Sequence, residues 1–261
     1  MLEAYEHISS GGKGSIILRA FDGWDALRNW KARCQFRWNK EPGEMSVKQI
    51  LEFILARVGL RLEVKSSSPA ITNFYPDFSV HPGNSGEGII KRLLTFVPDI
   101  IFIEGCRAYL VNPQSNDESV YGYGTDHGLY GSAYYRGAMK FDRIQIEGRD
   151  AETGMQVLVD SFNWDELNRC GERWQHLIDL NIGTVALAQE RGLAYLREVE
   201  IHKIDGYIRA PVNCGQQMYD VIEVTDARAG LSAGKRRVLG IFLIYNPGHG
   251  EYEQRLLLRA A

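Results

Sequence analysis

The alternation of hydrophobic and polar residues predicts short strands and amphipathic helices along the whole chain. The clearest signal covers residues 46–58. Ser46 and Gln49 have the spacing of a capping box, and Met45 is placed to pack on Ile50 as a hydrophobic staple. Apolar residues then follow at helical spacing, namely Ile50, Leu51, Ile54, Leu55 and Val58. Gly59 supplies the residue type that commonly ends a helix.

The rest of the first half of the chain also contains both predicted strands and predicted helices. We expect a strand over residues 15–21, a helix capped by Asp22, and strands over residues 60–65 and 78–80. Asn84 or Ser85 caps a second amphipathic helix. Residues 100–104 and 107–111 have the pattern of a β-hairpin turning at Gly105. Residues 41–116 are therefore predicted to form one α+β domain.

Residues 114–137 are rich in Gly, Tyr, Ser and Asp, and they predict a loop-like linker or an exposed arm. Beyond Phe141 the pattern is mainly that of strands. It includes one helix capped by Thr184, then strands over residues 198–208, 219–225, 237–245 and 252–258, the last two joined by a turn at 246–250. Closely spaced antiparallel strands predict a barrel-like or sandwich domain with one inserted helix.

Composition narrows the class of protein without choosing a function. The 261 residues include 44% hydrophobic and 24% charged residues, which is typical of a soluble globular protein, and the formal net charge is -3. This charge does not favour binding to nucleic acid or to an anionic membrane. The longest apolar run, residues 93–103, is shorter than the ~20 residues of a membrane-spanning helix. The first 15 residues lack the apolar core of a signal peptide, so we expect synthesis in the cytoplasm.

Cysteines and histidines give no metal-binding pattern. Cys34, Cys106, Cys170 and Cys214 lie far apart, and we expect them to be free thiols packed as small apolar groups. The six histidines are isolated from one another and from the cysteines, which argues against a zinc site. We predict no metal ligands and no cofactor.

Motifs that resemble catalytic or phosphate-binding sequences are incomplete. Residues 82–86 are similar to the segment around the nucleophilic serine of a protease. Such a serine needs a histidine base and a third residue that orients the base, and no motif identifies a partner for the neighbouring His81. Residues 230–236 resemble a phosphate loop, yet one residue is missing between the glycines and Arg236 replaces the Ser or Thr. Asp126 beside His127 is the remaining acid–base candidate. Because of this pair, a hydrolase whose active site is assembled from residues distant in sequence is a further alternative.

Two aromatic clusters are candidate interaction surfaces. Trp24, Trp30 and Trp38 alternate with cationic residues, which is compatible with nucleic-acid binding but favours packing or a subunit interface. The tyrosines of the Gly-rich segment suit either a sugar- or protein-binding surface or a loop ordered by a neighbouring subunit. The candidate surface comprises Tyr121, Tyr123, Tyr130, Tyr134, Tyr135, Trp30 and Trp38. These residues do not distinguish between an enzyme, an adhesin and a scaffold protein.

The order of several segments resembles the baseplate-hub and late-control D families of prophage tail proteins. Two segments carry the resemblance first, residues 21–27 (Phe-Asp-Gly-Trp-Asp-Ala-Leu) and residues 46–51 (Ser-Val-Lys-Gln-Ile-Leu). Residues 92–99 and 121–124 resemble the segments that follow in these families. Residues 211–216, 220–226, 237–241 and 252–256 resemble the closing strands. The likeness extends over nearly the whole chain from residue 15.

This resemblance implies a non-enzymatic structural protein of the virion. Hub proteins form rings, commonly trimers, that join the tail tube to a spike or tip, and they have barrel domains. The implied partners are further copies of the chain, the tube and the spike. The alternative is a carbohydrate- or receptor-binding protein of the tail tip that uses the Tyr-rich segment.

The resemblance also implies a domain organisation. Family members carry a β-rich domain before the Asp-Gly-Trp segment, whereas only 21 residues precede Asp22 here. We therefore expect residues 1–40 to be the remnant of a first β domain that is missing, split onto another gene or completed by a partner. Residues 41–116 form the α+β domain, and residues 117–261 form the barrel-like domain.

Overall fold

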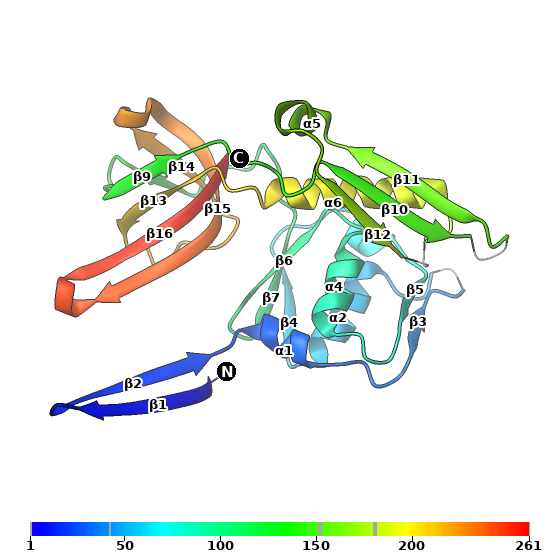
Figure 1. Ribbon diagram of the computed structural model, residues 1–261, viewed down its shortest axis with the longest axis horizontal. Helices are drawn as coiled ribbons and strands as arrows, with labels where there is room; N and C mark the ends of the chain where they lie inside the picture. The colour runs from blue at the N-terminus through cyan, green and yellow to red at the C-terminus, as the bar shows by residue number, and fades with distance from the viewer. Residues whose placement is uncertain (1, 42, 151–152, 180–181, 261) are drawn as a thin grey trace. The chain divides into compact units, whose positions relative to one another are not determined.

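The computed structural model describes residues 2–41, 43–150, 153–179 and 182–260. The chain divides into two compact units, residues 1–112 and 113–261. Each unit combines helices with sheets (Figure 1). The predicted α+β class is thus confirmed.

The first unit alternates strands with helices. Its elements are β1 (Leu2–Ser10), β2 (Lys13–Ala20), α1 (Gly23–Asn29), β3 (Phe36–Trp38), α2 (Val47–Ala56), β4 (Arg61–Val64), α3 (Ala70–Asn73), β5 (Phe78–Val80), α4 (Gly86–Leu94), β6 (Ile100–Glu104) and β7 (Arg107–Val111). β1 and β2 form a two-stranded hairpin, β3 pairs with β5, and β4, β7 and β6 form a three-stranded sheet.

Helix α2 begins where the capping box was predicted. The backbone N–H of Ser46 donates to Gln49 Oε1 at 2.8 Å, and the N–H of Gln49 donates back to Ser46 Oγ. Both interactions satisfy amide groups that a helix N-terminus otherwise leaves unpaired. Ser85, the second of the two residues proposed to cap the other helix, is the N-cap of α4.

The core of the first unit lies between these two helices and the β4–β7–β6 sheet. The buried apolar faces of α2 and α4 supply most of it, including Ile50, Leu51, Ile54, Leu55, Ile89, Ile90 and Leu93. Each such side chain removed from water contributes about 1.5–3 kcal/mol. The hairpin of β6 and β7 turns at Gly105, which has a φ of +58°. Its left-handed backbone suits glycine, as the predicted hairpin requires.

The second unit contains two sheets. Its elements are β8 (Tyr121–Tyr123), β9 (Gly131–Tyr134), β10 (Arg143–Arg149), β11 (Gln156–Phe162), α5 (Trp164–Cys170), β12 (Trp174–Ile178), α6 (Val185–Ile201), β13 (Gly206–Pro211), β14 (Val221–Asp226), η1 (Ala227–Ala229), β15 (Leu231–Asn246), η2 (Pro247–His249) and β16 (Glu251–Ala260). One sheet has the order β11-β10-β12, and the other has the order β8-β14-β15-β16-β13-β9.

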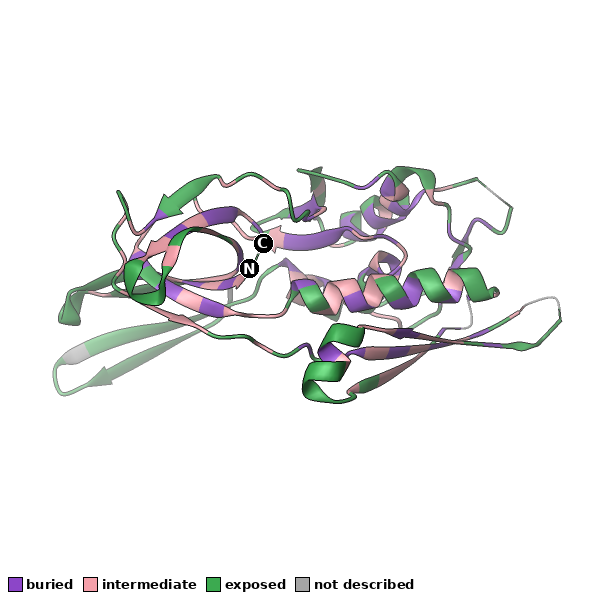
Figure 2. Ribbon diagram, turned by 90° about the horizontal axis from the view of Figure 1, so that it is seen from above, coloured by how far each residue is buried: buried purple, intermediate pink, exposed green. Residues whose placement is uncertain are grey.

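Helix α6 packs on the small sheet through residues spaced four apart. Ala188 and Leu196 are buried with Ile144 and Ile146 of β10 (Figure 2). Gly192 lies between them, and an added Cβ there would be 2.3 Å from Ser161 Oγ in β11. The glycine therefore permits a close approach of helix and strand that a side chain would prevent.

A cluster of charges around Glu166 joins α5 to the rest of the second unit. Its carboxylate accepts hydrogen bonds from Arg169 Nη2 at 2.6 Å and from Lys203 Nζ at 3.1 Å. The side chain is buried, which by itself raises the pKa of a carboxyl group. The hydrogen bonds from Arg169 and Lys203 outweigh burial and lower the pKa of Glu166 to about 2. The group is therefore a buried carboxylate held in its charged form.

Several predictions about the second unit were wrong. Residues 198–208 were expected to be a strand because Glu198–Asp205 alternates apolar and polar residues, but α6 continues to Ile201 since Leu196 and Val199 pack at helical spacing. Residues 114–137 were expected to be loop-like, yet they contain β8 and β9. The unit has two helices, α5 and α6, where one was predicted.

The sheets also differ in topology from the prediction. β12 runs parallel to β10, and β8 runs parallel to β14, so the domain is not purely antiparallel. Among the described strands no sheet is closed into a barrel, because the six-stranded sheet ends at β8 and β9, which do not pair with each other. The predicted strands at the C-terminal end do occur, and η2 joins β15 to β16 at the expected turn.

Two expectations from composition can be compared with the structure. The four cysteines are free, as expected, but each is exposed, so the prediction that they pack as small apolar groups was wrong. None of the helices in the described part of the chain is long and apolar enough to cross a membrane.

The contact of α6 with β11 can be tested by replacing Gly192 with alanine. The added methyl group would overlap Ser161, and overpacking of this kind costs about 1–3 kcal/mol. Alanine in a helix interior returns only ~1 kcal/mol. We expect a lower urea midpoint for Gly192→Ala, with partial recovery in Gly192→Ala/Ser161→Ala. Glu190→Ala on the exposed side of α6 is the control. A variant more stable than the parent protein would contradict the close approach.

The Glu166 cluster predicts a pH dependence of stability. The folded-state pKa of Glu166 lies below the ordinary value of 4.5. Its contribution is therefore present above pH 4.5 and is lost as the pH falls toward 2. We expect Glu166→Gln to lower the free energy of unfolding at neutral pH, because Arg169 and the half-buried Lys203 lose their charged partner. The difference from the parent protein should shrink on acidification in urea titrations. Asp165→Asn, exposed in the same helix, serves as the control, and an undiminished difference at low pH would refute the assignment.

Candidate interaction site

The Tyr-rich segment forms both edges of the six-stranded sheet. Tyr121 and Tyr123 lie in β8, which pairs in parallel with β14, and Tyr134 lies in β9, which pairs with β13. The connection between the two edge strands is held by two backbone hydrogen bonds, from Gly124 N to His127 O and from Tyr130 N to Arg209 O, both 2.8 Å long. The segment is therefore an ordered part of the sheet rather than a free arm.

Gly124 allows this segment to lie directly against β14. Its φ is +95°, and an added Cβ would be 1.8 Å from the carbonyl oxygen of Thr225. Both the conformation and the close approach require glycine. This position brings the connection over the end of the sheet next to the turn at η1.

Tyr123 belongs to the core rather than to a surface. Only 1% of the residue is exposed. Its hydroxyl donates to Gln216 Oε1 at 3.0 Å and accepts from Gln254 Nε2 at 2.9 Å. Burial raises the pKa of this hydroxyl above its ordinary value, which keeps it neutral. The network satisfies buried polar groups and orients β8 on β16.

His127 is held by two hydrogen bonds that do not include Asp126. Its Nε2 lies 2.9 Å from the carbonyl oxygen of Pro211, which can only accept, so this nitrogen donates. Its Nδ1 lies 2.9 Å from the hydroxyl oxygen of Tyr121, within hydrogen-bond distance. The acid–base pair considered from the sequence is thus replaced by a structural role for His127.

A cavity of about 620 Å³ lies between the Tyr-rich segment and the turn after β14. Asp226 accepts hydrogen bonds from Ser132 Oγ at 2.6 Å and from the hydroxyl of Tyr134 at 3.3 Å. The bond from Ser132 lowers the pKa of Asp226, against a smaller effect of burial. Burial raises the pKa of Tyr134. The cavity thus offers an ionised carboxylate, neutral hydroxyls and the exposed ring of Tyr130.

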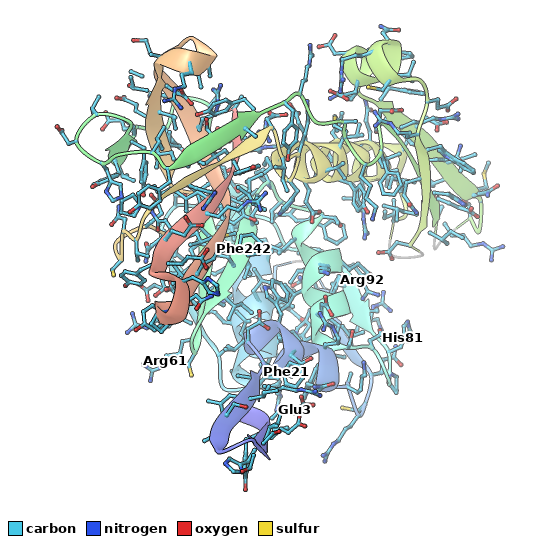
Figure 3. All side chains as sticks on the ribbon, turned by 60° about the vertical axis from the view of Figure 1, so that its left-hand side comes forward. Glu3, Phe21, Arg61, His81, Arg92 and Phe242 are labelled. Carbon is cyan, nitrogen blue, oxygen red and sulfur yellow. The ribbon has the colours of Figure 1, made fainter. Side chains whose placement is uncertain are left out.

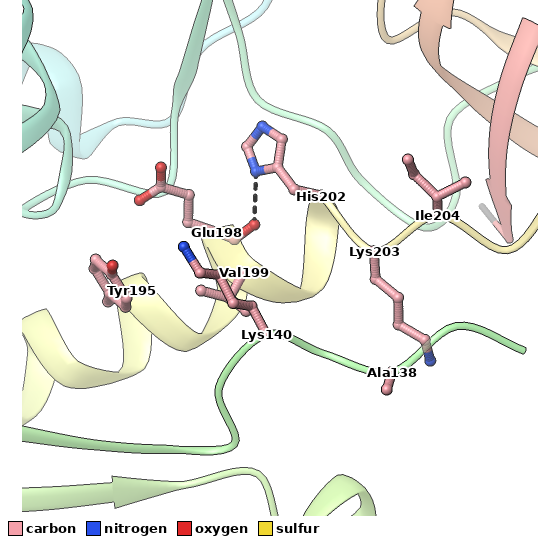
Figure 4. Close-up of a pocket in the computed structure, with 8 residues that line it drawn as sticks. All are labelled: Ala138, Lys140, Tyr195, Glu198, Val199, His202, Lys203 and Ile204. Atoms are coloured by element: carbon pink, nitrogen blue, oxygen red, sulfur yellow. Dashed lines mark hydrogen bonds between the residues drawn. The ribbon is translucent and has the colours of Figure 1, made fainter. Parts of the chain in front are cut away.

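A second cavity, of about 410 Å³, lies beside the C-terminal end of α6 (Figure 4). His202 Nδ1 donates to the carbonyl oxygen of Glu198 at 2.8 Å, and its Nε2 lies 3.0 Å from the hydroxyl of Tyr219. Burial raises the pKa of Tyr219 to about 12. His202 and Tyr219 are therefore both engaged in this contact.

The predicted interaction residues differ in their exposure to solvent. Tyr121, Tyr130 and Tyr135 are exposed, with 59% of Tyr130 accessible to solvent. In the first unit, Trp30 is half-buried against the core. Trp38 is buried and stacks on Phe36, with ring centroids 5.6 Å apart. Trp38 therefore packs in the core, which is the role that we favoured for the tryptophan cluster.

Sequence reasoning missed Asp226 as the residue that links β9 to the turn after β14. Its position two residues before Arg228, whose N–H it accepts, was the available signal for a capped turn. Within the described residues, no three His, Cys, Asp or Glu side chains are grouped so that they could hold a metal ion. The arrangement therefore offers contact surfaces and one polar cavity.

Comparisons with known proteins identify the fold. No protein family profile matches the chain, and no curated protein does. Several solved structures resemble it, among them three tail proteins. The 43 kDa tail protein of prophage MuSo2 from Shewanella oneidensis matches with a TM-score of 0.67 and 11% identity over 98% of this chain and 77% of its own.

The second is a tail protein from Neisseria meningitidis MC58, which matches with a TM-score of 0.68 and 12% identity over 99% of this chain and 78% of its own. The third is prophage tail protein gp18 from Listeria monocytogenes EGD-e, with a TM-score of 0.53 and 13% identity over 98% and 75%. The chain therefore has, over nearly its whole length, the fold found in these phage tail proteins.

Proposed function

We propose that this protein is a non-enzymatic structural component of a phage or phage-like tail. The observation that carries the proposal is the extent of the fold likeness, which covers 98–99% of the chain in three tail proteins. A match over both compact units is more specific than a match to one common sheet. At 11–13% identity the likeness concerns the fold, and the role in a tail is our inference from it.

Exposed apolar side chains support a role in assembly. The hairpin of β1 and β2 exposes Tyr5, Ile16 and Leu18, and the hairpin of β15 and β16 exposes Leu243 and Tyr245. Soluble monomers rarely expose large contiguous apolar patches, and such patches mark interaction sites. In the two cavities, by contrast, Ser132, Asp226 and His202 are engaged in hydrogen bonds within the protein.

Within the tail we place the protein at the baseplate hub or tail tip, where it would link the tube to the spike as a trimer. Residues 117–261 would form the barrel-like domain of the ring, in which the open six-stranded sheet takes the place of a closed barrel. Residues 41–116 would form the α+β domain, and residues 1–40 would complete a β structure with a partner. The virion is then the site of action, and the partners are proteins rather than nucleic acid.

The alternative is a carbohydrate- or receptor-binding protein of the tail tip. The observation in its favour is the cavity at Asp226, where a carboxylate and two hydroxyl groups lie beside the exposed Tyr130. Such groups can hydrogen-bond a sugar, and an exposed aromatic ring can stack on it. This role is compatible with a position at the tip.

The proposed assembly predicts the solution mass. We expect light scattering coupled to size exclusion to give a stable species near three times 29.5 kDa over a range of concentrations. Negative-stain images of that species should show rings. A monomer at every concentration would remove the ring-forming role. Turnover of peptidoglycan or another glycan by the purified protein would overturn the non-enzymatic assignment.

A glycan array separates the alternative from the structural role. If the protein is a scaffold, we expect no glycan to bind and the mass to be unchanged in Tyr130→Ala/Tyr134→Ala. Binding of a glycan that this double variant loses would favour the tip-adhesin function. Tyr135→Ala is the matched control, because Tyr135 is exposed but is not among the residues that line the cavity.

A further inference from the structure

The hairpin of β1 and β2 is a ribbon with two open edges. Each strand pairs with the other, and in the described part of the chain neither pairs with a third strand. Its described side chains from Glu3 to Ala20 are exposed on both faces (Figure 2). An isolated two-stranded hairpin is marginal in water and needs a further strand or a packed face for stability.

A second open edge lies on β15. β14 pairs with β15 from Leu231 to Arg237, and the last backbone contacts are those of Val238 with Asp220 and Tyr219. A bulge between Val238 and Gly240 follows. Over residues 240–246 the described structure pairs β15 with β16 alone, so its other edge is unpaired.

The 240–246 edge lacks the features that normally prevent strand addition, and β2 lacks them over its central residues 15–18, although Lys13 and Arg19 lie near its two ends. Edge strands are usually guarded by charged residues or proline. Residues 240–246 (Gly-Ile-Phe-Leu-Ile-Tyr-Asn) contain neither, and nor do residues 15–18 (Ser-Ile-Ile-Leu) of β2. β1, by contrast, carries Glu3 and Glu6. We therefore infer that the edge of β1 faces solvent and that the edge of β2 pairs with the further strand. Figure 3 labels Glu3 in β1 and Phe242 in β15.

The faces of the two hairpins match in character. Tyr5 lies opposite Leu18, and Ile16 lies on the same face of the ribbon. Leu243 and Tyr245 share a face of β15, with Tyr252 opposite Tyr245. Five of the six most exposed large apolar side chains among the described residues belong to these two faces, namely Tyr5, Tyr245, Leu243, Ile16 and Leu18.

We propose that β2 of one copy adds as a strand to the 240–246 edge of β15 in a neighbouring copy. The added strand would satisfy the open backbone groups of both edges and would join the two apolar faces into one. The proposal deepens the proposed function, on which it rests, by naming the surfaces that hold the copies together. The ribbon β1–β2 would then extend the six-stranded sheet across the subunit boundary.

A second copy is the occupant that the chain itself supports. The donor edge and the acceptor edge are different surfaces of the same protein, so their contact is head-to-tail. Such contacts generate rings when the rotation closes. The acceptor segment 240–246 carries no charge that would repel Lys13 or Arg19 of β2, and β2 is long enough, with eight residues, to cover a seven-residue edge.

Crosslinking between two differently tagged copies tests the pairing. In a background with Cys34, Cys106, Cys170 and Cys214 replaced by serine, one copy carries Ile17→Cys and the other carries Phe242→Cys. A bismaleimide should join the two tags covalently after co-expression. Leu193→Cys, an equally exposed position on α6, replaces Phe242→Cys in the control and should yield no joined product.

Mass measurements on charge variants complete the test. Leu18→Lys or Leu243→Lys should convert the oligomer to monomer, whereas Val185→Lys at another exposed apolar position should not, and circular dichroism should show every variant folded. A monomeric parent protein would overturn the proposed function together with this pairing. If the parent protein is oligomeric, but the lysine variants leave its mass unchanged and the Ile17→Cys and Phe242→Cys copies do not crosslink, the pairing alone is overturned. A crosslink formed within one chain, in a copy carrying both cysteines, would assign the edge to the protein's own hairpin.

Discussion

Pairing of backbone groups along strand edges is the constraint on which the rest of this structure depends. Every strand presents N–H and C=O groups that must find partners, and the protein meets this need in different ways along its length. In the six-stranded sheet the interior strands β14, β16 and β13 each have a neighbouring strand on both sides, whereas β15 is paired on both sides only up to Val238. The ends of that sheet are β8 and β9, and the Tyr-rich connection between them is ordered because it belongs to both.

Hydrogen-bonded polar groups hold the parts of the second unit in place. The hydroxyl of Tyr123 joins β8 to β16, Asp226 joins β9 to the turn after β14, and Glu166 joins α5 to Lys203 beyond the end of α6. Tyr123 and Glu166 are buried, and their partners satisfy them where water does not, whereas Asp226 is partly exposed. The carboxylates of Glu166 and Asp226 thereby help to maintain the fold.

The exposed apolar hairpins have the opposite character. They contain the residue types of a core, but in the described part of the chain no third strand pairs with their open edges. A protein that must stay dissolved before assembly and bind tightly afterwards can keep such residues for its neighbours. The fold shared with tail proteins and the unpaired edges both support the proposed structural role.

Local chemistry was sufficient to predict the elements whose signals lie within a few residues. Ser46 and Gln49, the turn at Gly105, the cap at Thr184 and the turn before β16 all follow from contacts between near neighbours in the sequence. Tertiary packing decided the rest. Residues 198–201 alternate as a strand does, yet they are helical because α6 is long enough to cover the β11–β10–β12 sheet.

Tertiary structure likewise made strands of the Tyr-rich segment, since β14 and β13 offered edges to it. It made Trp38 and Tyr123 core residues and His127 a structural one, because burial and partners depend on residues far away in the chain. The sequence by itself determined the class of fold and the local caps and turns. The pairing of edges, and therefore which surfaces stay free for a partner, was decided only when distant strands met.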